Sequence, residues 1–505
     1  MTVQAYSTPS ASKQEKFNRG LWRQGDIIEV TVDALSNRGD GVGRWIDSNA
    51  QASVGTDADA DGQKGHRVVF IPDAVPGDRL RVRLVRVKPS YAHGKLVNIV
   101  KPSSERIKPS CIVADKCGGC QWQSVNYERQ LLAKYHEVCQ CLERIGGFDA
   151  SLVEPVEAST HLGYRNKVSY PLRQAESKAK VQAGYYQKGS HKLVNLNQCP
   201  VQDQRLNTFL TDLKEDIHTR NWSIYDEKRH QYSLRHLSLR VGRRTGEVLL
   251  TLVSRDKCLN GLEEQAKRWL QIYPNLAGVC LNINDQRTNA IFGQKTSTIA
   301  GRGYIEEIFA DISFQIHSTT FFQVNTEQAE KLLRLVQKKL ALTGTEKIVD
   351  AYCGIGTMTL PLAHQTGRMI GIEFHPASIT QALKNAASNN IHNVGFHVGK
   401  TELLLPRLRD LAPGFGIPDV VMLDPPRKGC DRAVLETLRS LRPSRIVYIS
   451  CNPATLARDL KILCAQESMG SESPSQAYYQ LESVYPFDFF PQTSHVESVA
   501  FLALA

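Results

Sequence analysis

The sequence predicts a multidomain chain that ends in an α/β domain built on a parallel, doubly wound sheet. From about residue 320 onward, short apolar strands alternate regularly with helical segments, which is typical of this fold class. Nearer the amino terminus, short strands separated by glycine-rich turns indicate a small OB-like β-barrel. Between these parts lies an α+β region that holds a cluster of cysteines. At 505 residues the chain has room for about three domains.

The composition is that of a globular protein with an anionic partner. Hydrophobic residues make up 41% of the chain and charged residues 22%, which excludes a wholly disordered, collagenous or membrane-embedded chain. No apolar run is long enough to span a membrane, and residues 1–20 lack the apolar core of a secretory signal, so we expect a cytoplasmic protein. The 62 Lys and Arg exceed the 51 Asp and Glu, and this net charge of +11 favours nucleic acid over a membrane. The sequence points to no protein partner.

We expect four parts in chain order. Residues 1–20 form a flexible tail, 21–103 the β-barrel, 104–315 the central α+β domain and 316–505 the α/β domain. In the central domain, the pattern predicts a helix over Tyr127–Arg144 that two glycines stop.

The predicted barrel carries basic residues on one strand. Its strands are expected at Asp26–Val32, His66–Ile71 and Asp78–Lys88, with a flexible loop over Asp47–Gly65. Arg81 and Arg83 alternate with apolar residues, so both should project from one face of the barrel. That face either follows the phosphates of a nucleic acid or protects a sheet edge with charge.

A second basic stretch, Arg220–Arg244, interleaves Trp222 and two tyrosines with seven Lys or Arg. Such a mixture suits base stacking combined with phosphate contacts. An ordinary amphipathic sheet would explain it equally well.

The carboxy-terminal domain should contain five parallel strands, at Lys347–Asp350, Arg368–Glu373, Gly395–Val398, Asp419–Asp424 and Arg445–Ser450. Two further strand-like pieces, near Leu481–Asp488 and Val496–Leu504, have no long helix between them. We therefore expect these two to pair antiparallel at one edge of the sheet.

A cofactor pocket is predicted where the first strands end. Gly354 and Gly356 let the backbone pass close to a ligand, but the third glycine of a dinucleotide motif is replaced by Thr359, which disfavours a nicotinamide cofactor. Glu373 ends the second strand and is placed to bind ribose hydroxyls. Asp424 ends the fourth strand and is held there by two prolines. Together these features indicate S-adenosylmethionine.

Cys451 is the candidate nucleophile. It follows a strand, and Asn452 and Pro453 are typical of a helix cap and a first helical position. The free amides and dipole of that helix are expected to lower the pKa of the thiol. A cysteine alone is more often a small buried hydrophobe, but its place beside the predicted pocket favours catalysis.

A thiolate beside a methyl donor suggests one particular reaction. The C5 carbon of uracil becomes nucleophilic enough to accept a methyl group once a thiolate has added to C6. A base must then remove the C5 proton before the thiolate can leave. Glu497, at the start of the final strand, is the first candidate for this base, and His495 is the second.

Four segments carry a resemblance to a known family: Tyr352–Gly356, Asp424–Arg427, Ile449–Pro453 and His495–Glu497. In this order they resemble the RNA uracil-5-methyltransferases, which make 5-methyluridine with S-adenosylmethionine, and the likeness spans nearly the whole chain from residue 25. It implies a Rossmann-like class I methyltransferase domain, Cys451 as nucleophile and Glu497 as proton acceptor. It also implies four cofactor-binding residues, namely Gln323, Tyr352, Glu373 and Asp424. The amino-terminal barrel resembles the TRAM domain, an RNA-binding module, from which the loop Asp47–Gly65 departs.

Four cysteines are candidate metal ligands: Cys111, Cys117, Cys120 and Cys199. Four thiolates can hold either zinc or an iron–sulfur cluster. Three close cysteines and one remote cysteine fit an iron–sulfur cube better than the two close pairs usual for zinc. Members of the resembled family that act on ribosomal RNA carry a [4Fe–4S] cluster at a matching motif, so the resemblance implies the same cluster here.

The resemblance implies 23S-type ribosomal RNA as the substrate, since barrel and cluster together are typical of that branch. The T-loop uridine of transfer RNA is the alternative. An amino-methyltransferase is disfavoured, because Arg427 stands where those enzymes place an aromatic residue, and Cys451 would have no task. A non-catalytic RNA-binding iron–sulfur protein is a further alternative, which the presence of both Cys451 and Glu497 opposes.

Overall fold

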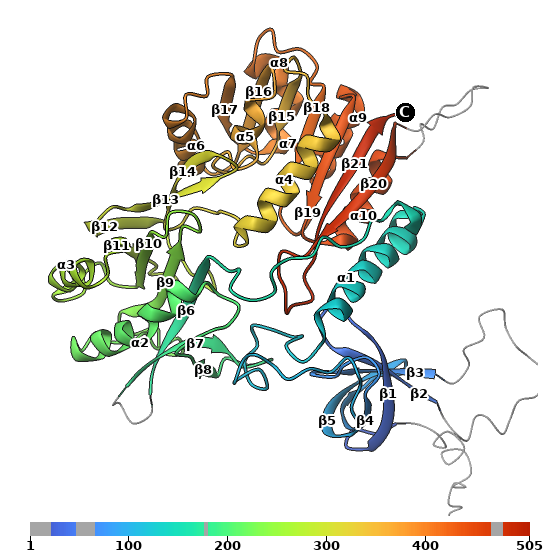
Figure 1. Ribbon diagram of the computed structural model, residues 1–505, viewed down its shortest axis with the longest axis vertical. Helices are drawn as coiled ribbons and strands as arrows, with labels where there is room; N and C mark the ends of the chain where they lie inside the picture. Colours follow the sequence, from blue (N-terminus) through green and yellow to red (C-terminus); the bar gives the residue numbers. More distant parts are fainter. Residues whose placement is uncertain (1–21, 47–65, 176–179, 466–477) are drawn as a thin grey trace, which may run out of the picture. The chain divides into compact units, whose positions relative to one another are not determined.

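The computed structural model describes residues 22–46, 66–175, 180–465 and 478–505 (Figure 1). The predicted tail and the predicted loop Asp47–Gly65 lie outside the described residues. The chain forms two compact units: the first comprises residues 1–108 with 121–126, and the second residues 109–120 with 127–505. The boundary expected near residue 315 falls inside the second unit and stays a prediction.

The first unit contains a closed five-stranded barrel, as predicted for an OB-like domain. Its strands are β1 (Ile27–Leu35), β2 (Gly41–Ile46), β3 (His66–Ile71), β4 (Arg79–Val87) and β5 (Tyr91–Lys101). They follow one another in the order β1-β2-β3-β5-β4, and only the β3–β5 pair is parallel. On β4, Leu80, Val82 and Leu84 are buried while Arg81 and Arg83 are exposed. The two arginines therefore share the outer face of this strand, as the alternation predicts.

The second unit contains a seven-stranded sheet, here called the central sheet, in the order β12-β11-β10-β9-β6-β7-β8. Its strands are β6 (Lys167–Gln174), β7 (Val181–Tyr186), β8 (Leu193–Asn195), β9 (Leu234–Val241), β10 (Val248–Ser254), β11 (Leu276–Ile283) and β12 (Lys295–Gly301). Helices α2 (Gln204–Thr219) and α3 (Leu262–Ile272) share a hydrophobic core with one face of the sheet. Trp222 is buried in this core, so its ring is unavailable for the base stacking that the sequence suggested.

Helix α1 (Tyr127–Cys141) continues as a π-helical turn over Leu142–Gly146 (η3), close to the predicted end. Gly147 has a left-handed backbone with a φ of 75°, and its amide bonds to the carbonyls of Glu143 and Leu142. A glycine adopts this conformation readily, which explains why the helix stops here.

The second large sheet of this unit, here called the carboxy-terminal sheet, has the order β17-β16-β15-β18-β19-β21-β20. Its strands are β15 (Lys347–Asp350), β16 (Arg368–Glu373), β17 (Val394–Val398), β18 (Val420–Leu423), β19 (Arg445–Ser450), β20 (Tyr479–Phe487) and β21 (Glu497–Leu504). The first five strands are parallel, whereas β21 runs antiparallel to both β19 and β20. This confirms the predicted doubly wound sheet with an antiparallel pair at its edge.

Helices cover both faces of the carboxy-terminal sheet (Figure 1). One face packs against α1, α9 (Arg432–Leu441) and α10 (Pro453–Leu463). The other packs against α4 (Thr326–Leu340), α5 (Thr359–Ala363), and the hairpin β13 (Tyr304–Phe309) and β14 (Ile312–His317). The remaining helical segments are η4 (Ala150–Leu152), α6 (Pro376–Ser388), α7 (Thr401–Leu404), η5 (Leu405–Arg407) and α8 (Leu408–Leu411). Because parallel strands end at one edge, the residues that follow β15, β16, β18 and β19 gather there.

In the described part of the chain, no helix combines the length and the apolar character that crossing a membrane requires.

Candidate active site

Sheet register brings Cys451 and Glu497 together. Cys451 directly follows β19, and Glu497 opens the antiparallel neighbour β21. Ser450 of β19 lies opposite Ser498 of β21, so the next residue in each direction is Cys451 on one strand and Glu497 on the other. The Glu497 side chain is buried, with a residue exposure of 6%, and its charge acts directly on the Cys451 thiol.

The start of α10 fixes the backbone around Cys451. As predicted, Asn452 caps the helix, its Oδ1 accepting the amide of Ala454 at 3.1 Å, and Pro453 occupies the first turn. The Nδ2 of Asn452 donates to the carbonyl of Arg427 at 3.1 Å, and the hydroxyl of Thr455 donates to the same carbonyl at 3.3 Å. These contacts tie the loop after β18 to the loop after β19.

The expectation that the helix terminus lowers the pKa of Cys451 is wrong. Burial raises the pKa of the thiol above its usual range, and the neighbouring carboxyls of Glu497 and Asp424 raise it further. Only the Arg427 guanidinium, which also hydrogen-bonds to the sulfur, lowers it. The amide of Ala454 already bonds to Asn452, so this part of the helix terminus is satisfied without the thiol.

Buried carboxyl groups line the same edge of the sheet. Burial raises the pKa of Asp424 to about 7, with a further contribution from the charge of Asp350. Burial likewise raises the pKa of Asp350 to about 6, although the Thr359 hydroxyl donates to its Oδ2 at 2.6 Å. The pKa of Glu497 lies well above its usual range because of burial and of Asp424. A positive charge next to these carboxyls would lower their pKa values again.

A pocket of about 490 Å³ opens at the ends of β15 and β18. Three of the four predicted cofactor residues, Gln323, Tyr352 and Asp424, line it. Glu373 does not line the pocket, but its carboxylate accepts the amide of Gly354 at 3.2 Å and that of His375 at 2.7 Å. It thereby fixes the glycine loop on the pocket wall.

Sequence reasoning missed several pocket residues, chiefly Asp350, Phe321 and Met358. For Asp350 there was a signal, because it ends the first strand immediately before the glycine loop. Thr359, which sequence analysis used only to exclude a dinucleotide motif, is the residue that donates to this carboxylate.

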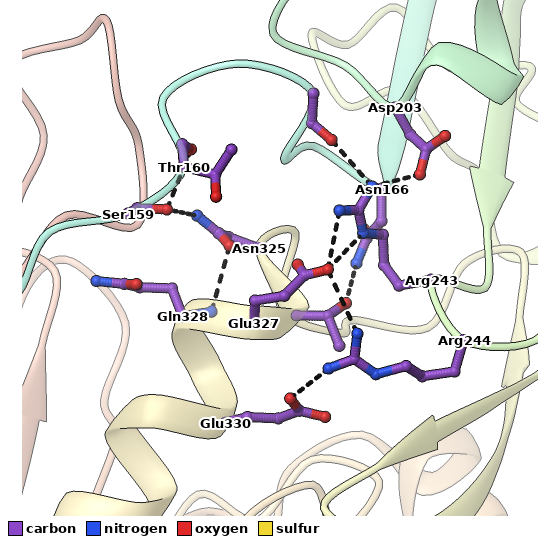
Figure 2. Close-up of polar contacts among 12 residues, drawn as sticks. Ser159, Thr160, Asn166, Asp203, Arg243, Arg244, Asn325, Glu327, Gln328 and Glu330 are labelled. Carbon is purple, nitrogen blue, oxygen red and sulfur yellow. Dashed lines mark hydrogen bonds and ion pairs between the residues drawn. The ribbon is translucent and has the colours of Figure 1, made fainter.

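Two asparagines hold the segment that carries Gln323. Figure 2 shows both asparagines, with Asn325 bonded to Ser159 and Gln328. Asn166 Nδ2 donates to the Gln323 carbonyl and to the Thr326 hydroxyl, both at 2.9 Å. Asn325 caps α4 through the amide of Gln328 at 3.3 Å. Its Nδ2 donates to the Ser159 hydroxyl at 2.9 Å and to the carbonyl of Phe489 at 3.3 Å. The cofactor side of the pocket is thus joined to the loop that leads to Glu497.

Two arginines of the central sheet form ion pairs with helix α4 (Figure 2). Arg243 Nε donates to Glu327 at 2.9 Å, and its Nη1 donates to Asp203 and to the carbonyl of Gly163. Arg244 Nη2 donates to Glu330 at 2.6 Å. The orientation of α4, and with it the position of Gln323, therefore depends on the central sheet.

The four candidate ligand cysteines gather around buried tyrosines. The thiols of Cys117, Cys120 and Cys199 all act on the Tyr185 phenol, whose pKa is raised mainly by burial, and Cys111 acts on the thiols of Cys117 and Cys199. The sulfur of Cys117 accepts the amide of Gly119 at 3.4 Å. Within the described residues, no three or more His, Cys, Asp or Glu side chains stand close enough together to hold a metal ion.

Backbone amides bond to two sulfurs of this cysteine group. Backbone amides also bond to the Cys199 sulfur, which lowers its pKa against the effect of burial. Amide-to-sulfur hydrogen bonds of this kind stabilise the thiolate form of cluster ligands. A side chain at Gly118 would meet the Tyr186 carbonyl at 2.9 Å, so the tight loop needs a glycine there.

The strand order, the glycine loop after β15 and the acidic residues at the strand ends define a class I methyltransferase domain. The family described as tRNA (Uracil-5-)-methyltransferase matches residues 126–504, and the TRAM domain matches residues 21–97. The chain therefore belongs to the tRNA (uracil-5-)-methyltransferase family and is an RNA uracil-5-methyltransferase with an amino-terminal TRAM domain.

Individual relatives agree with this assignment. An uncharacterized RNA methyltransferase of Nostoc sp. is 55% identical over 97% of this chain and 99% of its own. Another from Synechocystis sp. is 51% identical over 95% of this chain and 96% of its own. The crystal structure of Pyrococcus abyssi tRNA (uracil-54, C5)-methyltransferase in complex with S-adenosyl-L-homocysteine is 27% identical. It covers 94% of this chain and 99% of its own, with a TM-score of 0.70.

Proposed function

We propose that this protein methylates C5 of a specific uridine in 23S-type ribosomal RNA, in the cytoplasm, with Cys451 as nucleophile and Glu497 as proton acceptor. The observation that carries the proposal is the placement of Cys451 opposite Glu497 in the sheet register, next to Asp424 of the cofactor pocket. No binding protein would need a thiol and a buried carboxyl paired at this edge.

The reaction begins when the Cys451 thiolate adds to C6 of the uracil, which places negative charge on O4 and C5. Arg427, which hydrogen-bonds to the sulfur, favours the thiolate form needed for this step. S-adenosylmethionine supplies the electrophilic methyl group that C5 then takes. Glu497 in its carboxylate form removes the C5 proton, and the electron pair of that C–H bond reforms the C5–C6 double bond as the thiolate leaves.

Four residues would hold S-adenosylmethionine: Gln323, Tyr352, Glu373 and Asp424. The support is their gathering at the carboxyl ends of β15, β16 and β18, where nucleotide ligands bind in open α/β sheets. Glu373 is the candidate for the ribose hydroxyls, because it ends the second strand beside the glycine loop.

Cys111, Cys117, Cys120 and Cys199 would hold a [4Fe–4S] cluster with a structural or RNA-ordering role. The support is the placement of Cys117, Cys120 and Cys199 near Tyr185, the effect of Cys111 on the thiols of Cys117 and Cys199, and the amide bonds to those two sulfurs. Protein purified without oxygen should contain four iron and four sulfide per chain as the formula requires, and Cys199→Ser should lose both. Full folding and full RNA affinity in cluster-free protein would contradict the proposed role.

Transfer RNA is the second candidate substrate. It is favoured by the similarity in fold to the Pyrococcus abyssi tRNA (uracil-54, C5)-methyltransferase over 94% of this chain. The TRAM domain and the cysteine group, taken with the resemblance to the family members that act on ribosomal RNA, favour ribosomal RNA.

The test is methyl transfer from labelled S-adenosylmethionine to unmodified 23S-type rRNA and, separately, to tRNA transcripts, followed by digestion to nucleosides. Label in 5-methyluridine from rRNA alone is the expected result, and label from tRNA alone would replace the substrate. Cys451→Ala should abolish transfer while binding S-adenosylmethionine normally. Unchanged turnover in this variant would refute the mechanism.

A further inference from the structure

Two cations stand side by side on the central sheet. Lys167 of β6 lies directly opposite Arg240 of β9 in the sheet register. Like charges in this position repel each other and destabilise a sheet. The next pair on the same face, Ser169 and Ser238, is neutral and joined by a hydroxyl hydrogen bond of 2.8 Å. The repulsion is therefore confined to Lys167 and Arg240, and a bound anion would relieve it.

Arg240 is buried without compensation. Its exposure is 3%, and its Nη2 donates to the carbonyl of Thr320 at 2.6 Å. Its Nε and Nη1 have no hydrogen-bond partner among the residues that the structure describes. Buried guanidinium groups normally satisfy their donors and pair with a carboxylate. Glu307 is the acid that acts on Arg240, but its oxygens already accept the amides of Arg243, Arg244 and Ile308.

The ammonium group of Lys167 also has only weak contacts. Its Nζ reaches the carbonyl of Ser318 at 3.5 Å and lies 4.9 Å from the centre of the Phe292 ring. Arg165 adds a third positive charge, and within the described part of the chain none of the three cations forms a salt bridge. Burial together with the two arginines lowers the pKa of Lys167 to about 6. An anion beside it would restore the charge of this ammonium group.

Two of the three cations contact the chain segment that leads into the pocket. The carbonyls that Lys167 and Arg240 contact belong to Ser318 and Thr320, and the chain runs from there into Phe321 and Gln323, which line the pocket. Neither cation lines the pocket itself, so the cofactor carboxylate is a poor match for them. An RNA strand that holds its uridine against this pocket, at Cys451, would bring its backbone close to the segment that these cations contact.

We propose that Lys167, Arg240 and Arg165 form a phosphate site for the RNA strand that carries the target uridine. The inference rests on the proposed function and names one place where the protein binds the RNA backbone. Lys167, whose ammonium group has the weakest contacts, binds a phosphodiester next to the uridine. Arg240 is buried and adds its positive charge from beside Lys167, and the Lys167 contact acts on RNA of any sequence.

The test uses the whole protein and a fluorescein-labelled twelve-residue oligouridylate, whose dissociation constant is measured over a range of salt concentrations. Lys167→Met and Arg240→Gln should each weaken binding about 5- to 20-fold at low salt and lower the salt slope by about 0.7. The matched control is Arg268→Gln, an equal change of charge on the exposed side of α3, which packs on the other face of the sheet. This control should leave the salt slope unchanged. Arg240→Lys keeps the positive charge and should retain most of the native salt slope.

Two further measurements distinguish the loss of a phosphate contact from misfolding and from damage to the cofactor pocket. Melting temperature should stay level or rise in Lys167→Met, since one of two repelling charges is removed, and this shows that weak binding is not misfolding. The affinity for S-adenosylmethionine should not change. The proposed site is refuted if oligouridylate affinity does not change, or falls no more than in Arg268→Gln. It is also refuted if the variants lose affinity for S-adenosylmethionine and not for oligouridylate. Because no methyl transfer is measured, a chain that binds as expected but never makes 5-methyluridine refutes only the proposed function.

Discussion

The ammonium group of Lys134 and the carboxylate of Asp488 form an ion pair of 2.5 Å in which both side chains are fully buried. Asp488 also accepts the Tyr127 hydroxyl at 2.9 Å, and Lys134 donates to the carbonyl of Phe490 at 3.1 Å. Helix α1 thus holds the loop between β20 and β21, the strand that begins with Glu497. The start of β21, with the proposed proton acceptor Glu497, is therefore held in part by a helix from the other end of the unit's sequence.

Lys134→Met should lower the free energy of unfolding by about 3–5 kcal/mol, because it leaves the Asp488 carboxylate buried without its partner. Urea unfolding followed by tryptophan fluorescence measures this. The double variant Lys134→Met with Asp488→Leu should recover most of the loss, since no buried charge remains. Equal stability of the single variant and the native chain would contradict this account of the loop.

Glu497→Gln should trap the reaction halfway. Without a carboxylate the C5 proton stays in place, the thiolate cannot leave, and a covalent protein–RNA adduct accumulates after methylation. Denaturing gels with labelled RNA would show a band of reduced mobility. Adding Cys451→Ala should remove this band. If Glu497→Gln gives no adduct but still turns over, another base, with His495 first, takes its place.

Arg427→Gln should make Cys451 less reactive at a given pH. The guanidinium lowers the pKa of a thiol that burial and Glu497 raise, so its loss moves the thiolate to higher pH. Reactivity falls as pH falls through the raised pKa, and the midpoint of this fall should shift upward in the variant. Alkylation by iodoacetamide, followed at Cys451 by peptide mass spectrometry, gives the midpoint. A downward shift would show that Arg427 does not act on the sulfur.

S-adenosylmethionine should bind more tightly as pH rises from 5 to 8, and more steeply than S-adenosylhomocysteine, by about tenfold over that range. Asp350 and Asp424, with pKa values raised to about 6 and about 7, lose their protons over this interval and then attract the sulfonium charge. S-adenosylhomocysteine lacks the sulfonium charge, so it is the matched control in titration calorimetry. Parallel pH profiles for both ligands would show that these carboxyls do not interact with the sulfonium.

Asn166→Ala should raise the KM for S-adenosylmethionine several-fold with a smaller effect on kcat, because the carbonyl of Gln323 loses its donor and the pocket wall loosens. The control is Asn284→Ala, which removes a buried asparagine amide that donates to the Ala290 and Ile291 carbonyls at a distance from the pocket. Steady-state kinetics should separate the two variants. Equal kinetics would mean that Asn166 only stabilises the fold.

Local patterns in the sequence predicted much of the fold. The strands Lys347–Asp350, Arg368–Glu373 and Arg445–Ser450 match their predicted bounds, and Asn452 caps α10, because alternation and capping depend on neighbours in sequence. The raised pKa of Cys451 could not be predicted in this way, since burial and Glu497 reach it through the tertiary fold.

Other parts of the site depend on residues far apart in the chain. Lys134 and Asp488 are separated by 354 positions, and neither stands in a recognisable motif. Trp222 lies in a stretch whose composition suits RNA, yet its ring completes a hydrophobic core. Composition describes which contacts a segment could make, while burial decides which of them remain available.

The position of β21 has a consequence for the order of folding. This strand follows β20 in the chain but lies between β19 and β20 in the sheet. Strand β20 therefore cannot join the sheet by itself. Either β20 and β21 first form a hairpin that then pairs with β19, or β21 inserts between β19 and β20. The pocket at β15 and β18 needs neither step. Cofactor binding should thus not require β20 or β21, whereas Cys451 and Glu497 meet only once β21 lies beside β19.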